Sequence, residues 1–253
     1  GEAGGTASGT FADSWSTDVA APGSTSSYNF TNVAGGIDTN LTAELGSAPG
    51  FTGSGEKTII AWIKTTTTEQ DTYFGYSPTN GGGPGEDLRL LINGNGGDTT
   101  GKLRVEVSSG GFEFGSGLND GNWHMVAVVI NANDGVEDVD VYIDGVYTTN
   151  SGGGTSINTA ATGGGPNLNI LLGESGNTSR PYTGLLDEVA IYNTALSAGE
   201  LDVIRTVGIH DGVVLLGDVN LDGVVNFSDI SPFIGVLSNS GDQAEADCNE
   251  DGT

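Results

Sequence analysis

Oxygen-bearing side chains recur at regular spacing near the C-terminus, in a pattern that can wrap the chain around a calcium ion. With Asp218 as position 1 of a loop, Asp or Asn stands at positions 1, 3, 5, 9 and 12, and Gly223 stands at position 6. Calcium takes six to eight oxygen ligands, and the glycine permits the sharp turn that brings them together. The predicted ligands are Asp218, Asn220, Asp222, the backbone carbonyl of Val224, Asn226 and Asp229. The alternative is a turn rich in Asp and Asn that holds no ion.

A second copy of this loop begins at Asp247, 29 residues after Asp218, and extends only to loop position 7. Its predicted ligands are Asp247, Asn249 and Asp251. Because position 12 normally supplies a carboxylate, we expect the second loop to bind calcium more weakly than the first. Between the two loops, the apolar spacing of residues 230–237 predicts a helix with one apolar stripe.

The composition is strongly acidic. The 253 residues include 33 Asp and Glu against 7 Lys and Arg, which gives a formal net charge of −26. Proteins bind nucleic acids and anionic membranes largely through Lys and Arg, so this balance argues against both kinds of partner. No apolar run approaches the roughly 18 residues of a membrane-spanning helix, so we expect no membrane insertion. With Cys248 as its one cysteine, the chain can form no internal disulfide.

The charge is unevenly distributed along the chain and indicates two domains. Residues 211–253 contain nine Asp and Glu and no Lys or Arg, so all seven bases precede them. The earlier residues instead alternate short apolar runs with clusters rich in Gly, Asn, Asp and Ser. We therefore place a boundary near His210, between a large domain over residues 1–210 and a small calcium-binding segment over residues 211–253.

The large domain is predicted to be all-β. Strands are expected at residues 28–33, 58–64, 72–76, 87–92, 102–107, 112–114, 123–131, 139–143, 168–172 and 185–192. The run 123–130 is apolar on both faces, which indicates a central strand covered on both sides. Asp144-Gly145 predicts a hairpin turn. Many strands with hardly any helix favour a single antiparallel β-sandwich.

One short helix is expected near the end of the large domain. Ser197 and Glu200 have the spacing of a capping box, in which each side chain accepts a hydrogen bond from a backbone N–H of the other residue. We expect this helix to end by Arg205.

Four of the seven bases fall on predicted strands and point away from the apolar face. They are Lys64, Arg89, Lys102 and Arg104. If these faces coincide, the bases form a cationic patch beside Glu106 and Tyr142, suited to an acidic or heavily hydroxylated polysaccharide. The alternative is that the bases are scattered over the surface and paired with nearby acids.

No arrangement of residues predicts catalysis. Glycosidases need two carboxylates that flank the scissile bond. The nearest pair, Asp138 and Asp140, is better explained as the solvated start of a strand that follows the turn at residues 133–135. The histidines of the chain are His124 and His210, and neither accompanies a nucleophile. We interpret His124 as structural, because it follows Trp123 within a strand, and we expect the protein not to be an enzyme.

The C-terminal segment resembles the type I dockerin module, in which a calcium loop and a helix are repeated. The first loop matches that family at every ligand position, and the second matches at positions 1, 3, 5 and 6. The resemblance implies an extracellular docking element with a cohesin-like domain or another surface protein as its partner. Phe227 and Ser228 stand at the positions that bear on partner choice in that family.

Three stretches of the large domain resemble laminin G-like jelly-roll domains of the concanavalin A-like lectin and glucanase superfamily. They are residues 58–64, 122–145 and 184–197. The resemblance implies a jelly roll and a calcium ion held by Asp187 together with backbone carbonyls of residues 32–36. The alternative is that Asp187 only hydrogen-bonds local backbone. The E-x-D-x-x-E motif carried by hydrolases of this superfamily is absent from the sequence.

These features predict an extracellular, non-catalytic, calcium-dependent module that binds a polysaccharide or mediates adhesion and docks through its C-terminal segment. Two alternatives remain open. One is an accessory domain of a secreted polysaccharide-degrading enzyme, and the other is a structural subunit of a surface layer or filament.

Overall fold

The computed structural model describes residues 15–20, 22–30, 52–78, 83–93, 99–148, 154–159, 168–173 and 180–209. All of these residues belong to the large domain. Both predicted calcium loops, and residues 32–36 of the loop expected beside Asp187, lie outside the described residues.

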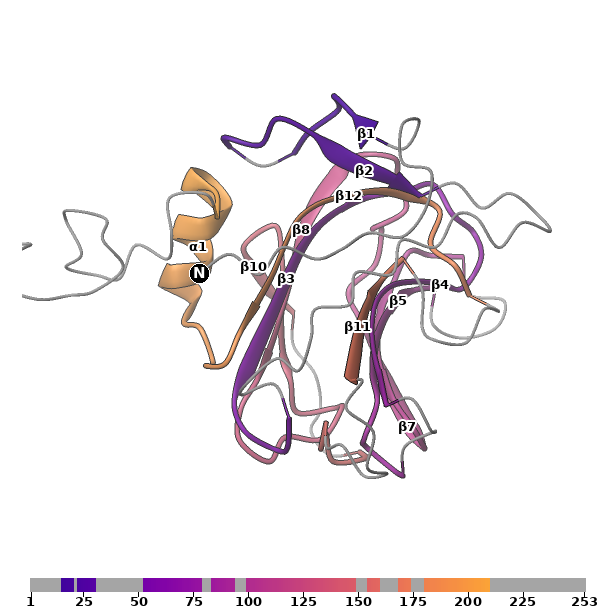
Figure 1. The fold of residues 1–253 in the computed structure, drawn as a ribbon, viewed down its shortest axis with the longest axis vertical. Coiled ribbons are helices and arrows are strands. Elements are labelled where there is room, and N and C mark those ends of the chain that lie inside the picture. Colours follow the sequence, from indigo (N-terminus) through magenta and orange to yellow (C-terminus); the bar gives the residue numbers. More distant parts are fainter. Residues whose placement is uncertain are drawn as a thin grey trace, which may run out of the picture.

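Two antiparallel β-sheets pack face to face, so the predicted β-sandwich is confirmed (Figure 1). The order of the seven-stranded sheet is β1-β2-β12-β3-β8-β9-β10, and that of the five-stranded sheet is β11-β4-β5-β6-β7. The first sheet contains β1 (Trp15–Ser16), β2 (Ser27–Phe30), β12 (Gly184–Tyr192), β3 (Lys57–Lys64), β8 (Trp123–Ile130), β9 (Asp140–Ile143) and β10 (Val146–Thr148). The second contains β11 (Leu168–Leu172), β4 (Asp71–Pro78), β5 (Leu88–Ile92), β6 (Leu103–Val107) and β7 (Gly110–Phe114).

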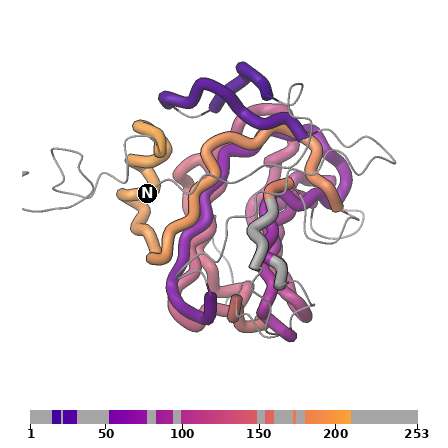
Figure 2. Tube along the Cα trace, in the orientation of Figure 1, coloured from indigo at the N-terminus to yellow at the C-terminus, as the bar shows by residue number. Residues whose placement is uncertain are grey.

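Each of the ten predicted strands is present, with ends that shift by a few residues. The predicted hairpin is also confirmed, since Asp144 and Gly145 have φ values of 53° and 81° and join β9 to β10. The sequence did not predict β1, because two residues are too few to show alternation. Strands far apart in the chain lie side by side, as β2 and β12 do (Figure 2). In the register of this antiparallel pair, Phe30 is opposite Gly184.

The paired strands β3 and β8 are apolar on both faces because they lie between two cores. On the inner face, Ile63 and Val128 belong to the cluster that joins the two sheets. On the outer face, Ile60 and Met125 pack with a second cluster that includes Ile204 of the helix. The prediction that the run 123–130 is covered on both sides is therefore confirmed.

Helix α1 (Ala198–Val207) covers part of the outer face of the seven-stranded sheet (Figure 1). The predicted capping box is present, since Ser197 Oγ accepts from the Glu200 N–H at 3.4 Å and the Glu200 carboxylate accepts from the Ser197 N–H at 2.7 Å. The helix runs two residues beyond the predicted end and stops before Gly208, whose φ is 99°. Within the described ranges, no helix has the length and apolar character needed to cross a membrane.

Both sheets bend in the same sense, and the five-stranded sheet lies on the inside of the bend (Figure 1). The outer face of the five-stranded sheet is therefore the concave side of the sandwich. We call it the concave face.

One base is buried at the start of β3. Lys57 is fully buried, and its Nζ donates to the backbone carbonyls of Gly53 and Gly55, both at 2.9 Å. Burial penalises the charged form and lowers the pKa of Lys57 to about 8. The unfolded chain, with an ordinary lysine pKa near 10.4, therefore binds more protons than the folded protein between pH 8 and that value.

This difference predicts that Lys57 makes the folded state more stable as the pH rises above 8, because the folded lysine loses its proton first. Relative to a Lys57→Met variant, the wild-type free energy of unfolding should increase by about 1–2 kcal/mol between pH 7 and pH 9.5. Urea denaturation of both proteins across this range measures the difference. Parallel pH profiles for the two proteins would contradict the depressed pKa.

Candidate functional site

Charged residues line the concave face because its strands alternate. Leu88, Leu90 and Ile92 of β5 and the apolar residues of β6 point into the core between the sheets. Alternation therefore turns Arg89, Arg104 and Glu106 outward. The strand register places Arg89 opposite Glu106 and Arg104 opposite Glu113 of β7. Acidic and basic side chains therefore meet directly across neighbouring strands.

Glu106 is the centre of this network. Its carboxylate accepts from Arg89 Nη1 at 2.9 Å, from Arg104 Nε at 2.8 Å and from Arg180 Nη1 at 3.1 Å. Arg89 also pairs with Asp87, whose carboxylate accepts from the backbone N–H of residue 108. The Glu106 side chain is 13% exposed and the three guanidinium side chains are 17–31% exposed, so the groups are held at the surface without being fully covered.

Arg180 reaches the network from outside the sheet. It lies in the segment that leads into β12, and its carbonyl accepts from the backbone N–H of Thr72 in β4 at 2.9 Å. Sequence reasoning did not find Arg180, because no strand pattern surrounds it. Alternation does place Glu113 outward, since it stands between Phe112 and Phe114, but the pairing of Glu113 with Arg104 required the strand register.

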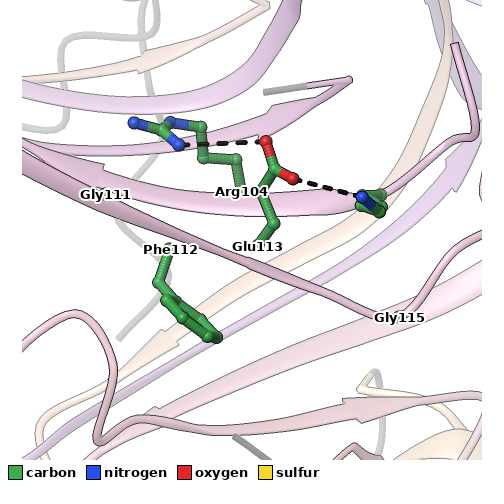
Figure 3. Close-up of a pocket in the computed structure, with 6 residues that line it drawn as sticks. Arg104, Gly111, Phe112, Glu113 and Gly115 are labelled. Carbon is green, nitrogen blue, oxygen red and sulfur yellow. Dashed lines mark hydrogen bonds and ion pairs between the residues drawn. The ribbon is translucent and has the colours of Figure 1, made fainter. Parts of the chain in front are cut away.

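A depression of about 340 Å³ lies beside β7, the edge strand of this sheet (Figure 3). It is lined by Lys102, Arg104, Gly111, Phe112, Glu113 and Gly115. Glu113 lies between two bases, with Oε2 at 3.4 Å from Lys102 Nζ and Oε1 at 3.9 Å from Arg104 Nη1. A Cβ atom on Gly111 would lie 2.5 Å from Arg104 Nη2, so this glycine leaves the space that the guanidinium occupies.

The predicted cationic patch is only partly assembled. Arg89, Lys102 and Arg104 share the concave face, but Lys64 and Tyr142 lie on the outer face of the other sheet. The prediction of one shared face was wrong for these two residues. Alternation shows which side chains of a strand point outward, but it does not show which of the two sheets the strand belongs to. The alternative interpretation was right that the bases are paired, although three of them are clustered rather than scattered.

Lys64 takes part in a separate polar group on the seven-stranded sheet. Its Nζ is 2.6 Å from Asp18, and Trp123 Nε1 donates to the same carboxylate at 2.8 Å. Hydrogen bonds from Lys64 and then from Trp123 lower the pKa of Asp18. Tyr142 instead lies beside Tyr147, with ring centroids 5.4 Å apart.

Asp187 is 5% exposed, and both of its carboxylate oxygens accept hydrogen bonds. One accepts from the Ala20 N–H at 3.0 Å and the other from Ser24 Oγ at 2.8 Å. This carboxylate thus ties the segment before β2 to β12, through one backbone N–H and one hydroxyl that both lie far from it in the sequence. Within the described residues, no group of three or more His, Cys, Asp or Glu is placed to hold a metal ion. Calcium binding by Asp187 stays a prediction.

His124 is held by two carboxylates, as expected for a structural residue. Nδ1 is 2.7 Å from Asp144 and Nε2 is 3.1 Å from Asp120. Burial alone would lower the pKa of His124, but the two carboxylates outweigh it and raise the pKa. Hydrogen bonds from Asn122 and then from His124 lower the pKa of Asp120 to about 2.

The carboxylate pair that we considered for catalysis is occupied by structural hydrogen bonds. Asp138 accepts from the Gly135 N–H at 3.0 Å, and Asp140 accepts from the Tyr147 hydroxyl at 2.9 Å. These contacts are compatible with the solvated strand start that we preferred for them, since β9 begins at Asp140.

A comparison with known protein families shows which family the chain belongs to. The family profile described as "Concanavalin A-like lectin/glucanases superfamily" matches residues 13–202, which is most of the chain. The chain belongs to this superfamily. The laminin G-like resemblance of the large domain is thereby confirmed, whereas the dockerin-like resemblance stays a prediction. None of the curated proteins matches the chain.

Solved structures share the fold of this superfamily member at low sequence identity. Domain 4 of AbnA, a GH43 extracellular arabinanase from Geobacillus stearothermophilus, was solved with arabinotriose. It is 18% identical, with a TM-score of 0.50 over 80% of this chain and 82% of that one. The NanB sialidase from Streptococcus pneumoniae is 15% identical, with a TM-score of 0.50 over 71% of this chain and 27% of that one. The matched region thus spans about a quarter of NanB.

The Glu106 network makes a stability prediction. A Glu106→Gln variant leaves three guanidinium groups facing each other without their shared carboxylate, so the free energy of unfolding should fall by about 1–3 kcal/mol. Because salt screens this repulsion, the loss should shrink between about 0.05 M and 0.5 M NaCl. Urea denaturation at both salt concentrations measures it.

A Glu56→Gln variant removes the same charge from an exposed side chain just before β3 of the other sheet and serves as the control. It should not show the salt-dependent loss. A Glu106→Gln protein as stable as wild type at low salt would show that the three arginines do not depend on this carboxylate.

Proposed function

We propose that this domain is a carbohydrate-binding module, without catalytic activity of its own, whose ligand lies across the concave face. The observation that carries the proposal is the Glu106 network. Sugar hydroxyls both donate and accept, and they bind best to polar groups that are already held in place. Each guanidinium has five N–H donors, and the ion pairs of the network use only some of them.

The charge balance of this face favours a neutral, hydroxyl-rich polysaccharide over an acidic one. Among the described residues, the ion pairs of this face involve four bases and three acids: Arg89, Lys102, Arg104, Arg180, Asp87, Glu106 and Glu113. Each of these bases lies within ion-pairing distance of one of the acids. An acidic polysaccharide would meet little uncompensated positive charge here and would be repelled by a protein whose net charge is −26.

Binding would rest on hydrogen bonds rather than on aromatic stacking. The exposed aromatic rings among the described residues are Trp15 and Tyr147, and both belong to the seven-stranded sheet. The arabinotriose complex of AbnA domain 4 supports the choice of a neutral oligosaccharide as the first ligand to test. We further propose that the chain is secreted, as an accessory or adhesion module of a protein that works on polysaccharides.

The C-terminal segment would give this module its calcium dependence and its docking function. The support is the ligand spacing from Asp218 to Asp229, which places an oxygen at each of the six ligand positions of a calcium loop. A cohesin-like or other surface protein would then be the partner.

Binding to immobilised polysaccharides tests the proposal. The protein should bind neutral chains, such as debranched arabinan or xylan, in preference to polygalacturonate. An Arg180→Ala variant should weaken that binding about tenfold or more, because a hydrogen bond from a charged donor is worth about 1.5–3 kcal/mol. Lys64→Ala removes a base from the opposite sheet and should leave binding unchanged. Equal losses in the two variants, or no binding by the wild type, would refute the proposed face.

Calorimetric titration of the full chain with calcium tests the metal site. The double variant Asp218→Asn and Asp222→Asn should lose the tighter binding event, because it removes two of the charged ligands. Asp187→Asn should retain it. If instead Asp187→Asn abolishes binding and the double variant does not, the ion belongs to the large domain.

A further inference from the structure

The depression beside β7 contains an acceptor with no donor. Glu113 Oε1 is buried, and no donor of the described residues reaches it within hydrogen-bond distance. The nearest base, Arg104 Nη1, is 3.9 Å away, whereas N–H···O hydrogen bonds span about 2.7–3.2 Å. A buried carboxylate oxygen left in this state is costly, so a group that supplies a donor would be stabilised there.

The surroundings of this oxygen define the group that fits. Arg104 is held by its Nε hydrogen bond to Glu106 at 2.8 Å, so the guanidinium cannot approach Glu113 without breaking that bond. A hydroxyl is both donor and acceptor. It could donate to Glu113 Oε1 and accept from Arg104 Nη1, and so bridge the gap between them.

Access to this position depends on small residues and on one exposed side chain. Gly111 and Gly115 line the depression without side chains of their own (Figure 3). Lys102, the most exposed charged side chain at this end of the network at 38%, can shift to admit a ligand. Phe112 points to the other side of the strand, so it does not fill the space beside Glu113 (Figure 3).

We infer that Glu113 accepts a hydrogen bond from a sugar hydroxyl and makes the concave face select neutral sugars over acidic ones. The inference rests on the proposed carbohydrate binding and assigns its specificity to one residue. An acidic sugar would bring a carboxylate, which only accepts, against the unpaired oxygen of Glu113. Like charges would then oppose binding at this position.

Exchange of this carboxylate for an amide of the same shape separates a specificity role from a structural one. In a Glu113→Gln variant, affinity for debranched arabinan should fall about fivefold to tenfold, because the amide oxygen still accepts a hydrogen bond but the bond is no longer strengthened by the negative charge. Affinity for polygalacturonate should rise, because the variant removes one of the carboxylates that offset the positive charges of Lys102 and Arg104. Glu188→Gln removes one negative charge from the opposite sheet and should change neither affinity.

The outcomes distinguish this inference from the proposed function. If wild-type protein binds neither polysaccharide, carbohydrate binding on this face fails, and the role of Glu113 fails with it. If wild-type protein binds arabinan and Glu113→Gln behaves like Glu188→Gln, only the role of Glu113 is overturned. A parallel fall in both affinities, together with a lower melting temperature, would also overturn it, because that result describes a structural residue.

Discussion

The strand pair β3 and β8 is buried on both faces, and the rest of the domain is arranged to cover it. Its inner face packs against the five-stranded sheet, and its outer face packs against α1. Apolar surface removed from water contributes about 25 cal/mol per Å², so a strand pair covered twice is a strong organising constraint. The helix is consequently a packing element of the sandwich, held at its start by the Ser197 and Glu200 capping box.

The five-stranded sheet covers the inner face of this strand pair with its apolar side. Its other side, the concave face, is where the charged side chains lie together. Four of the seven bases of the chain gather there, around one carboxylate that accepts from three arginines. Pairing keeps the local charge nearly balanced while it fixes the direction of many hydrogen-bond donors. That combination suits a neutral polar ligand better than a strongly charged one.

Much of the fold could be predicted from the sequence, because the signals were local. Alternation located the strands, the doubly apolar run 123–130 identified a central strand, and Asp144-Gly145 located a hairpin. The candidate site was less predictable. Arg89, Lys102 and Arg104 were found together, but Lys64 and Tyr142 were assigned to a face that they do not share. Arg180 gave no signal, since it joins the network from a segment outside the strands.

The sequence by itself determined which residues turn inward and which turn outward, where the turns and the helix begin, and that the C-terminal segment has the ligand spacing of a calcium loop. These properties depend on neighbours within a few positions of the chain. Only the tertiary structure decided which outward faces coincide, because strand order in a sheet joins residues separated by tens of positions. Glu106, Arg89 and Arg180 meet for that reason. The unpaired oxygen of Glu113 also depends on the strand register, because β7 places Glu113 opposite Arg104 while Glu106, two residues along β6, holds the guanidinium.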